Sequence, residues 1–195
     1  MAENNLTDPA EVPTEDPRPA ELRTARSLVV VNTGNGKGKT SAGIGMVIRA
    51  VAQEWPVVVV QFLKSESWKT GEEKICRELG VDWWVDGEGF TWESEDLAVD
   101  QAAALATWRR AKAAIEAGEH RLVMLDEITY PINWGWIDEA EVVDTITNRP
   151  DRVSIIVTGR DAPASIVAVG DTVSEINEVK HAYAAGIAAK KGIDY

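Results

Sequence analysis

Cysteine is nearly missing from this sequence, since Cys76 is the only one in 195 residues. A single thiol excludes an internal disulfide and any metal or iron–sulfur site built from cysteines alone, and it suits a reducing compartment. We expect Cys76 to be a small buried thiol within a helix.

Long apolar runs are missing as well. No run reaches the roughly 18 residues of a membrane-spanning helix, and the N-terminus lacks the apolar core of a signal peptide. We therefore expect a cytoplasmic protein with no membrane partner.

Basic residues are the scarcer charge class. The chain has 20 lysines and arginines against 32 aspartates and glutamates, a formal net charge of -12. Such a surface repels a phosphate backbone, so we expect no nucleic-acid partner. A small anion can still bind where basic groups gather at one site.

Residues 1–26 form a distinct segment, with four of the eight prolines, acidic residues between them and few large apolar groups. Such a composition cannot offset its ordering entropy, so the segment is predicted to be a flexible arm. Either it has no role, or it orders over a site or a partner subunit. Residues 27–195 are long enough for one domain and too short for two of ordinary size.

Apolar segments alternate with helical ones throughout this domain. Strands are expected at 28–32, 57–62, 81–85, 122–125, 153–158 and 172–176. Continuous runs such as "VVVVQF" are typical of strands covered on both faces. The sequence therefore predicts an α/β fold, a parallel sheet with helices on both faces.

Three helices have recognisable ends. Ser94 is expected to cap a helix over 95–117, with Leu97, Leu105, Trp108 and Ile115 roughly on one side. Gly80 is expected to end a helix in "GEEKICRELG", and Pro163 to begin one over 163–169.

The segment "SLVVVNTGNGKGKTSAGIGM", residues 27–46, combines a strand, a glycine-rich turn and a helix. It nearly matches the phosphate loop G-x-x-x-x-G-K-[ST], except that Thr33 replaces the first glycine. The glycines let successive N–H groups converge on an anion at the helix start. Lys39 adds a positive charge, and Thr40 a hydroxyl for a divalent cation.

Other residues of this loop have less certain roles. Lys37 is either a second phosphate ligand or an exposed lysine without a contact. Gly43 and Gly45 would weaken a helix, so we expect close packing there against the sheet or the ligand.

A second motif, "HRLVMLDEITY", places Asp126 and Glu127 at the end of an apolar strand. In phosphate-loop proteins a carboxylate in this place reaches the metal beside the loop. Together the two motifs predict a site for a nucleoside triphosphate and Mg²⁺ or Mn²⁺, with Thr40, Asp126 and Glu127 at the metal; whether Asp126 or Glu127 is the direct ligand is left open. The residues expected to bind ATP are Thr33, Gly34, Asn35, Gly36, Lys37, Gly38, Lys39, Thr40, Ser41 and Arg160.

Aromatic residues are unusually placed. Trp83 and Trp84 should point to opposite faces of a strand, so that at least one packs in the core. "GEGFTWES" has the composition of a loop, in which Phe90 and Trp92 either meet a ligand or fold back on the core. Tyr130, Trp134 and Trp136 in "YPINWGW" follow the carboxylates. Aromatic side chains gathered near one end of the sheet would form walls that suit a flat, largely apolar substrate.

The sequence resembles the ATP:corrinoid adenosyltransferases, the branch with a RecA-like phosphate-loop fold. The resemblance covers about residues 27–195. It is carried by "NTGNGKGKTSA", "QFLK", "GEGFTW", "LDEITYPINWGW", "VTGRDAP" and "DTVSEINEVKHAYAAGIAAKKGIDY". It implies transfer of the 5′-deoxyadenosyl group of ATP to cobalt(I) of a corrinoid, with release of triphosphate. ATP then lies reversed in the loop, its γ-phosphate deep.

The resemblance also implies partners and residue roles. It implies a homodimer and a flavoprotein-type electron donor for cobalt(II). Phe90 and Trp92 resemble the residues that occupy the lower face of the corrinoid, and with Lys39 they are the expected catalytic residues. Tyr130 and Trp134 are also expected to contact the corrinoid. His181 is expected to make a structural or nucleotide-side hydrogen bond. Arg160 is a phosphate or ribose contact, or a surface salt bridge.

Two other classes share part of this pattern. A recombinase-type ATPase would have the same loop, with Glu127 polarising an attacking water. A non-catalytic nucleotide-binding module would not need Thr40, Asp126 and Glu127 together. The sequence also leaves two classes of corrinoid acceptor open. One is a biosynthetic corrinoid such as cobyrinic acid a,c-diamide, and the other is salvaged cobalamin or cobinamide.

Overall fold

One parallel sheet organises the protein. The computed structural model describes residues 21–65, 70–87 and 97–194. The sheet has the strand order β3-β2-β4-β5-β1-β6, and each neighbouring pair is parallel. The strands are β1 (Val29–Thr33), β2 (Val57–Ser65), β3 (Asp82–Gly87), β4 (Leu122–Asp126), β5 (Ser154–Thr158) and β6 (Thr172–Glu175). The predicted α/β class with a parallel sheet is confirmed.

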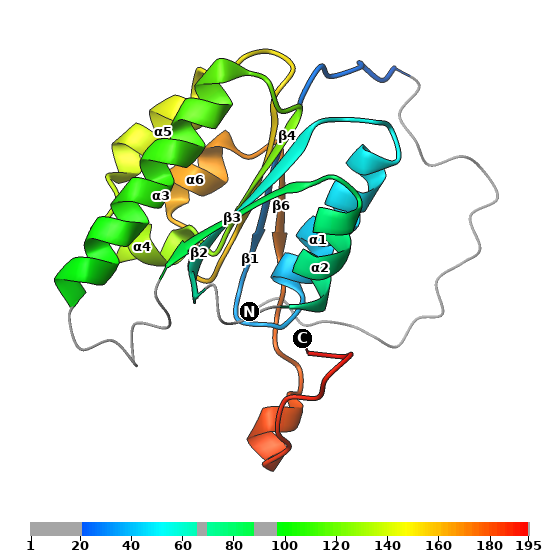
Figure 1. Cartoon of the computed structure of the whole chain (residues 1–195), viewed down its shortest axis with the longest axis vertical. Coiled ribbons are helices and arrows are strands. Elements are labelled where there is room, and N and C mark those ends of the chain that lie inside the picture. Colours follow the sequence, from blue (N-terminus) through cyan, green and yellow to red (C-terminus); the bar gives the residue numbers. More distant parts are fainter. Residues whose placement is uncertain (1–20, 66–69, 88–96, 195) are drawn as a thin grey trace.

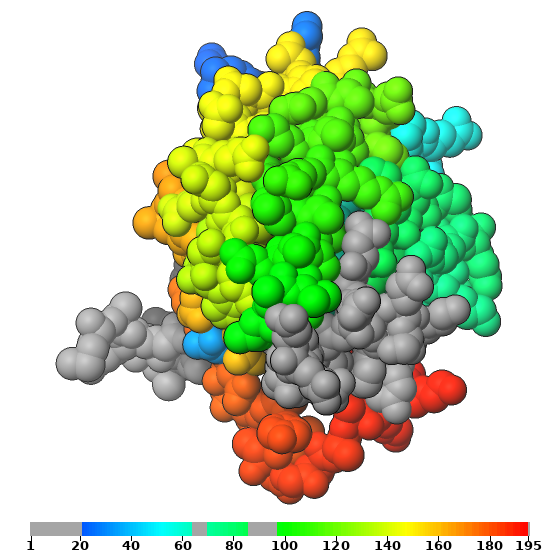
Figure 2. Space-filling view, turned by 60° about the vertical axis from the view of Figure 1, so that its left-hand side comes forward, coloured from blue at the N-terminus to red at the C-terminus, as the bar shows by residue number. Residues whose placement is uncertain are grey.

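Helices cover both faces of this sheet (Figure 1). On one face lie α1 (Lys39–Val51) and α2 (Gly71–Glu78). On the other lie α3 (Leu97–Ala117), α4 (Thr129–Asn133), α5 (Glu139–Thr147) and α6 (Ala164–Val169). Helices α3 and α5 pack side by side across the molecule (Figure 2).

The strands are apolar because both faces are buried. Every residue of β4 is buried, and two hydrophobic clusters flank the sheet. Trp83 packs in the cluster beneath α1 and α2, whereas Trp84 packs against the cluster on the opposite face, as predicted. Cys76 is a buried free thiol in α2, also as predicted.

Most strand and helix boundaries agree with the expected ones to within a few residues, but β2 continues to Ser65 through a bulge after Gln61. Helix α3 is described from Leu97, so the expected cap Ser94 lies outside the described residues, as do residues 1–20 of the expected arm. Of the four residues expected roughly on one side of α3, Trp108 and Ile115 are buried, whereas Leu97 is 61% exposed.

The two helix glycines behave differently. A Cβ at Gly43 would lie 2.6 Å from Met124 Cε, so α1 packs closely on β4 here, and a side chain at this position would require Met124 to move. At Gly45 no atom lies within 4 Å of such a Cβ, and the expectation of close packing was wrong for this glycine.

The carboxyl ends of the strands lie together at one edge of the sheet. The loop between β1 and α1 lies there, and so does the segment after β6, which forms a 3-10 helix at Ala182–Ala185 (Figure 1). The C-terminal segment, residues 176–194, projects below the helices from this edge (orange to red in Figure 2). This edge carries the candidate site.

Candidate active site

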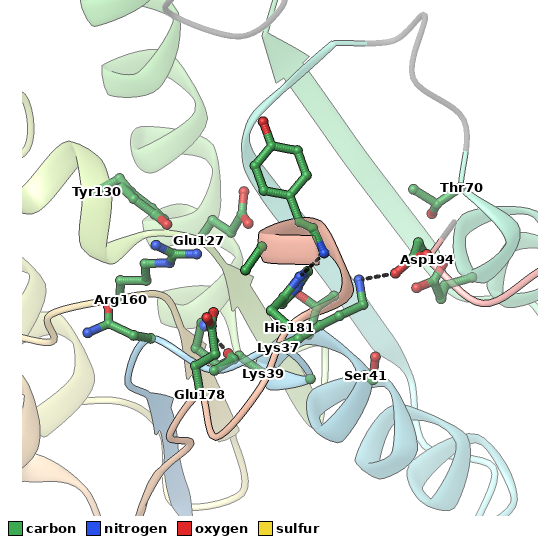
Figure 3. A pocket seen from close by; sticks show the side chains of 17 residues that line it. Lys37, Lys39, Ser41, Thr70, Glu127, Tyr130, Arg160, Glu178, His181 and Asp194 are labelled. Carbon is green, nitrogen blue, oxygen red and sulfur yellow. Dashed lines mark hydrogen bonds and ion pairs between the residues drawn. The ribbon is translucent and has the colours of Figure 1, made fainter. Parts of the chain in front are cut away.

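The loop between β1 and α1 lines a pocket of about 560 Å³ (Figure 3). The predicted ATP-binding residues that line it are Asn35, Gly36, Lys37, Gly38, Lys39, Thr40, Ser41 and Arg160. Thr33 and Gly34 are not among the lining residues. Thr33 Oγ1 instead accepts a hydrogen bond of 3.1 Å from the Ala162 N–H, which ties β1 to the loop after β5.

The conformation of this loop depends on glycine. Gly38, at φ 116, turns the chain into α1, which begins without a side-chain cap. The first amides of α1 therefore remain for an anion in the pocket, where the helix dipole also favours negative charge. At Gly36 a Cβ would lie 2.8 Å from the Asn177 backbone, so the C-terminal segment approaches too closely for a side chain.

Two lysines of the loop have partners of their own. Lys39 Nζ donates a hydrogen bond of 2.7 Å to the Gly36 carbonyl. Burial, and then the positive charge of Arg160, lower the pKa of Lys39, while Glu127 and Asp126 oppose this shift. Lys37 Nζ forms an ion pair of 2.8 Å with Asp194 Oδ1. Lys37 is thus not an exposed lysine without a contact.

Asp126 is completely buried at the end of β4. Its Oδ1 accepts hydrogen bonds from Thr40 Oγ1 at 2.8 Å and from Thr158 Oγ1 at 2.7 Å. Its Oδ2 accepts one of 2.9 Å from Gln61 Nε2. Asp126 therefore connects the start of α1 to the middle of β2 and to the ends of β4 and β5.

Glu127 differs from Asp126 in backbone conformation and in exposure to the pocket. Its φ of 63 lies in the left-handed region, which is rare for a residue with a side chain and is often found at functional sites. Its N–H donates a hydrogen bond of 3.0 Å to Thr158 Oγ1, which supports this conformation. The side chain lines the pocket beside Tyr130. The two predicted metal-site carboxylates therefore face different surroundings.

Arg160 and Tyr130 line the same side of the pocket as Glu127 (Figure 3). The Arg160 carbonyl accepts a hydrogen bond of 2.7 Å from Thr129 Oγ1, which fixes the loop after β5 against α4. Within the described ranges Arg160 has no ion pair, so the alternative of a surface salt bridge finds no partner there. Burial, and then the charge of Glu127, raise the pKa of Tyr130.

The predicted corrinoid-binding aromatics are only partly described. Phe90 and Trp92 lie outside the described residues. Trp134 does not line the pocket but packs on Tyr130, with ring centroids 5.7 Å apart, and on Trp136, at 4.7 Å. Trp134 is 42% exposed, so these three rings form an open aromatic surface beside the pocket.

Sequence reasoning missed most of the C-terminal wall of the pocket. The Ile176 carbonyl accepts a hydrogen bond of 2.6 Å from the Gly36 N–H, and Glu178, Tyr183 and Asp194 line the pocket. His181 also lines it, and its Nδ1 accepts a hydrogen bond of 3.0 Å from the Tyr183 N–H. A structural hydrogen bond was expected for His181. The only sequence signal for the wall was the C-terminal motif.

The donors at this site are hydroxyl and carboxylate oxygens. Across residues 21–65, 70–87 and 97–194, no group of three or more His, Cys, Asp or Glu side chains could hold a metal ion. Thr40 and Glu127, which line the pocket, nevertheless carry oxygen donors of the kind that Mg²⁺ prefers when substrate phosphates and water complete its coordination, and Asp126 is buried behind Thr40. In the same ranges no helix is long and apolar enough to span a membrane.

Comparisons with known proteins agree with this geometry. The family described as "ATP:corrinoid adenosyltransferase BtuR/CobO/CobP" matches residues 25–195. A corrinoid adenosyltransferase of Escherichia coli K12 is 40% identical over 180 residues, covering 92% of this chain and 91% of that protein. One from Pseudomonas aeruginosa is 40% identical over 182 residues, covering 92% and 89%. One from Sinorhizobium is 38% identical over 174 residues, covering 87% and 81%.

Proposed function

The chain belongs to the ATP:corrinoid adenosyltransferase family, and from this premise we propose how its site carries out the reaction. The enzyme transfers the 5′-deoxyadenosyl group of ATP to cobalt(I) of a corrinoid and releases triphosphate, a step that makes adenosylcobalamin. The observation that carries the mechanism is the single pocket in which Lys37, Lys39, Arg160 and the start of α1 converge.

The triphosphate is the group that this pocket suits best. In the transfer, the bond between cobalt and C5′ forms while the bond between C5′ and the phosphate oxygen breaks, and triphosphate leaves with the electron pair. Two lysines, Arg160 and the α1 amides offset its growing charge. We place the γ-phosphate deep in the loop, as in the family, so that C5′ faces outward.

We assign Mg²⁺ or Mn²⁺ to Thr40 and Glu127. Both side chains line the pocket, whereas Asp126 is buried beneath them and acts through the Thr40 hydroxyl. When bound, the metal would neutralise part of the charge on the leaving triphosphate.

No general base is needed at this site. Cobalt(I) is already a strong nucleophile with no proton to lose, so the residues need only orient ATP, stabilise the leaving group and admit the corrinoid. This requirement agrees with the two lysines and Arg160 that line the pocket beside the start of α1. Tyr130 and Trp134, on the aromatic surface beside the pocket, are proposed to contact the flat corrinoid.

Phe90 and Trp92 are proposed to occupy the lower face of the corrinoid. Removing the lower axial ligand makes cobalt(II) easier to reduce, which a flavoprotein-type donor then does. We expect Phe90→Ala combined with Trp92→Ala to leave the protein folded and able to bind ATP. Turnover should fail from cobalt(II) and recover when chemically reduced cobalt(I) is supplied. Equal loss from both oxidation states, with a lowered melting temperature, would assign both rings to ordinary packing.

A product assay tests the proposed mechanism directly. Cobalt(I) forms of cobalamin, cobinamide and cobyrinic acid a,c-diamide are each incubated with the enzyme, ATP and Mg²⁺. Phosphorus NMR should show triphosphate in amounts equal to the adenosylated corrinoid. ADP and phosphate without adenosylation would indicate a recombinase-type ATPase, and unchanged ATP a binding module. The acceptor with the highest kcat/KM identifies the natural corrinoid class.

A further inference from the structure

Gln61 is a polar residue buried in the middle of β2, just before the bulge of that strand. It is 3% exposed and follows four buried valines of β2. The sheet register pairs Gln61 with Asp126 of β4 and brings Thr158 of β5 to the other side of Asp126. A buried amide is costly unless its donors and its acceptor are hydrogen-bonded. Gln61 satisfies both kinds of group within the protein.

The orientation of the Gln61 amide follows from its two partners. Trp83 Nε1 lies 3.1 Å from Gln61 Oε1, and Gln61 Nε2 lies 2.9 Å from Asp126 Oδ2. An indole can only donate and a carboxylate can only accept, so a flipped amide would face both partners with the wrong group. Trp83 itself is 3% exposed and held in the core. The indole therefore fixes the amide, and the amide fixes one oxygen of Asp126.

This chain of hydrogen bonds ends at Thr40. With Oδ2 held by Gln61, Asp126 presents Oδ1 to the Thr40 hydroxyl at 2.8 Å. A threonine hydroxyl has one proton, and here it is donated to a carboxylate. The lone pairs of Thr40 Oγ1 are then left for a cation in the pocket that Thr40 lines.

We propose that Gln61 and Trp83 are positioning residues for the metal site. Acting through Asp126, they hold the Thr40 hydroxyl with its lone pairs toward the divalent cation that accompanies ATP. This inference rests on the proposed metal role of Thr40. Neither residue is among those that line the pocket, so neither is expected to touch the nucleotide. Hydrogen-bond partners of this kind typically change metal affinity by about ten- to a hundredfold.

The test measures how much the metal strengthens ATP binding. Calorimetric titrations give the affinity of the full-length protein for ATP with Mn²⁺ and for ATP with a chelator, without corrinoid. The ratio of the two affinities isolates the metal contribution from general damage to the pocket. Gln61→Met removes both hydrogen bonds at similar length, and Trp83→Phe removes only the indole donor. We expect the ratio to fall about tenfold in Gln61→Met and less in Trp83→Phe, with metal-free binding unchanged.

Trp108→Phe is a matched control. Trp108 is likewise buried, and its Nε1 donates a hydrogen bond of 2.9 Å to Glu141 Oε2, away from the pocket. This variant should lose stability in a melting experiment but keep the wild-type ratio. An unchanged ratio in Gln61→Met would overturn the inference. If Gln61→Met fails to fold, an unchanged ratio in Trp83→Phe overturns the inference in its place. A lowered ratio in Trp108→Phe would also overturn it. If wild-type protein gains nothing from Mn²⁺, the proposed metal role fails as well.

Discussion

Lys39 has a partner within the resting pocket and is also proposed to contact the bound triphosphate. Its ammonium donates to the Gly36 carbonyl in this structure, and burial lowers its pKa. The folded pocket therefore disfavours the charged form of Lys39. This destabilisation of the fold is complete below the folded pKa and is lost as the pH rises from the folded pKa toward the unfolded one. A bound triphosphate has the opposite effect, because it favours the ammonium. Binding of ATP should thus draw a proton onto Lys39 at alkaline pH.

Proton uptake measures this coupling. We expect wild-type protein at about pH 9 to take up protons on binding ATP, detected by calorimetry in two buffers of different ionisation enthalpy. Lys39→Arg should abolish the uptake, since a guanidinium stays charged. Lys39→Ala should also lower turnover about a hundredfold or more. Equal uptake in wild type and Lys39→Arg, or an alanine variant of near wild-type activity, would contradict the role given to Lys39.

Residue identities alone predicted the glycine-rich loop that lines the pocket, but not its surroundings. The loop motif and "LDE" were readable because each is local in sequence. Gln61 and Thr158 were missed because they reach Asp126 only through the sheet register, from strands 65 and 32 residues away in sequence. The sequence shows a glutamine directly after a run of valines, but its position in the sequence does not indicate which residue it contacts.

At the scale of elements, α3 and α5 are joined by a partly exposed polar group that also reaches the buried Trp108. Glu141 accepts hydrogen bonds from Trp108 Nε1 at 2.9 Å and from Lys112 Nζ at 2.7 Å. The hydrogen bond from Lys112, and then that from Trp108, lower the pKa of Glu141. Since the folded pKa lies below the unfolded one, the stabilisation is complete above the ordinary glutamate pKa. It is lost as the pH falls through the folded value.

Removing Glu141 tests this link. Glu141→Ala leaves the indole N–H of Trp108 without its partner and should lower the free energy of unfolding by about 1 kcal/mol at neutral pH. The difference from wild type should shrink in acid. Glu116→Ala is the control, because Glu116 faces the same Lys112 at 3.9 Å on an exposed surface and should change stability by less than about 0.5 kcal/mol. Equal effects of the two variants in guanidinium unfolding would refute the link.

The C-terminal segment and the phosphate loop form a second such pair. Asp194 holds Lys37 at 2.8 Å, and the pKa of Asp194 is lowered by the Lys190 N–H and then by Lys37. A triphosphate in the pocket would compete with this carboxylate for Lys37. The resting structure therefore places an anion of the chain where an anion of the substrate is proposed to bind.

Asp194→Asn should release Lys37 and strengthen ATP binding by about two- to fivefold, the usual scale of an exposed ion pair. The measurement is the ATP dissociation constant by calorimetry at low ionic strength. Asp151→Asn removes the same charge from another exposed pair, with Arg26, and Asp151 does not line the pocket. It should leave the affinity unchanged. Weaker ATP binding in Asp194→Asn would instead make Asp194 part of the nucleotide site.

At the scale of the whole molecule, the sheet was predictable because a parallel sheet covered on both faces must be built from continuous apolar strands. Strand order was not predictable, since the alternation of strands and helices is compatible with several orders. The same limit applied to the site. The edge where it lies followed from the motifs, but its C-terminal wall depends on β6 lying beside β1. Only this pairing brings Ile176 onto Gly36.

The C-terminal segment also gives the molecule an unusual apolar surface. Val179 is 98% exposed, Tyr183 79% and Ile193 75%. Large apolar side chains that are exposed in one segment are consistent with a contact with another molecule. We propose a homodimer, in which residues 1–26 of one subunit cover the corrinoid site of its partner.

Sedimentation of the full chain at micromolar concentration should give a dimer. Deleting residues 1–26 should raise the KM for corrinoid but not for ATP, because the arm is placed over the acceptor rather than the phosphate loop. A fully active monomer, or an equal change in both KM values, would rule out this arrangement.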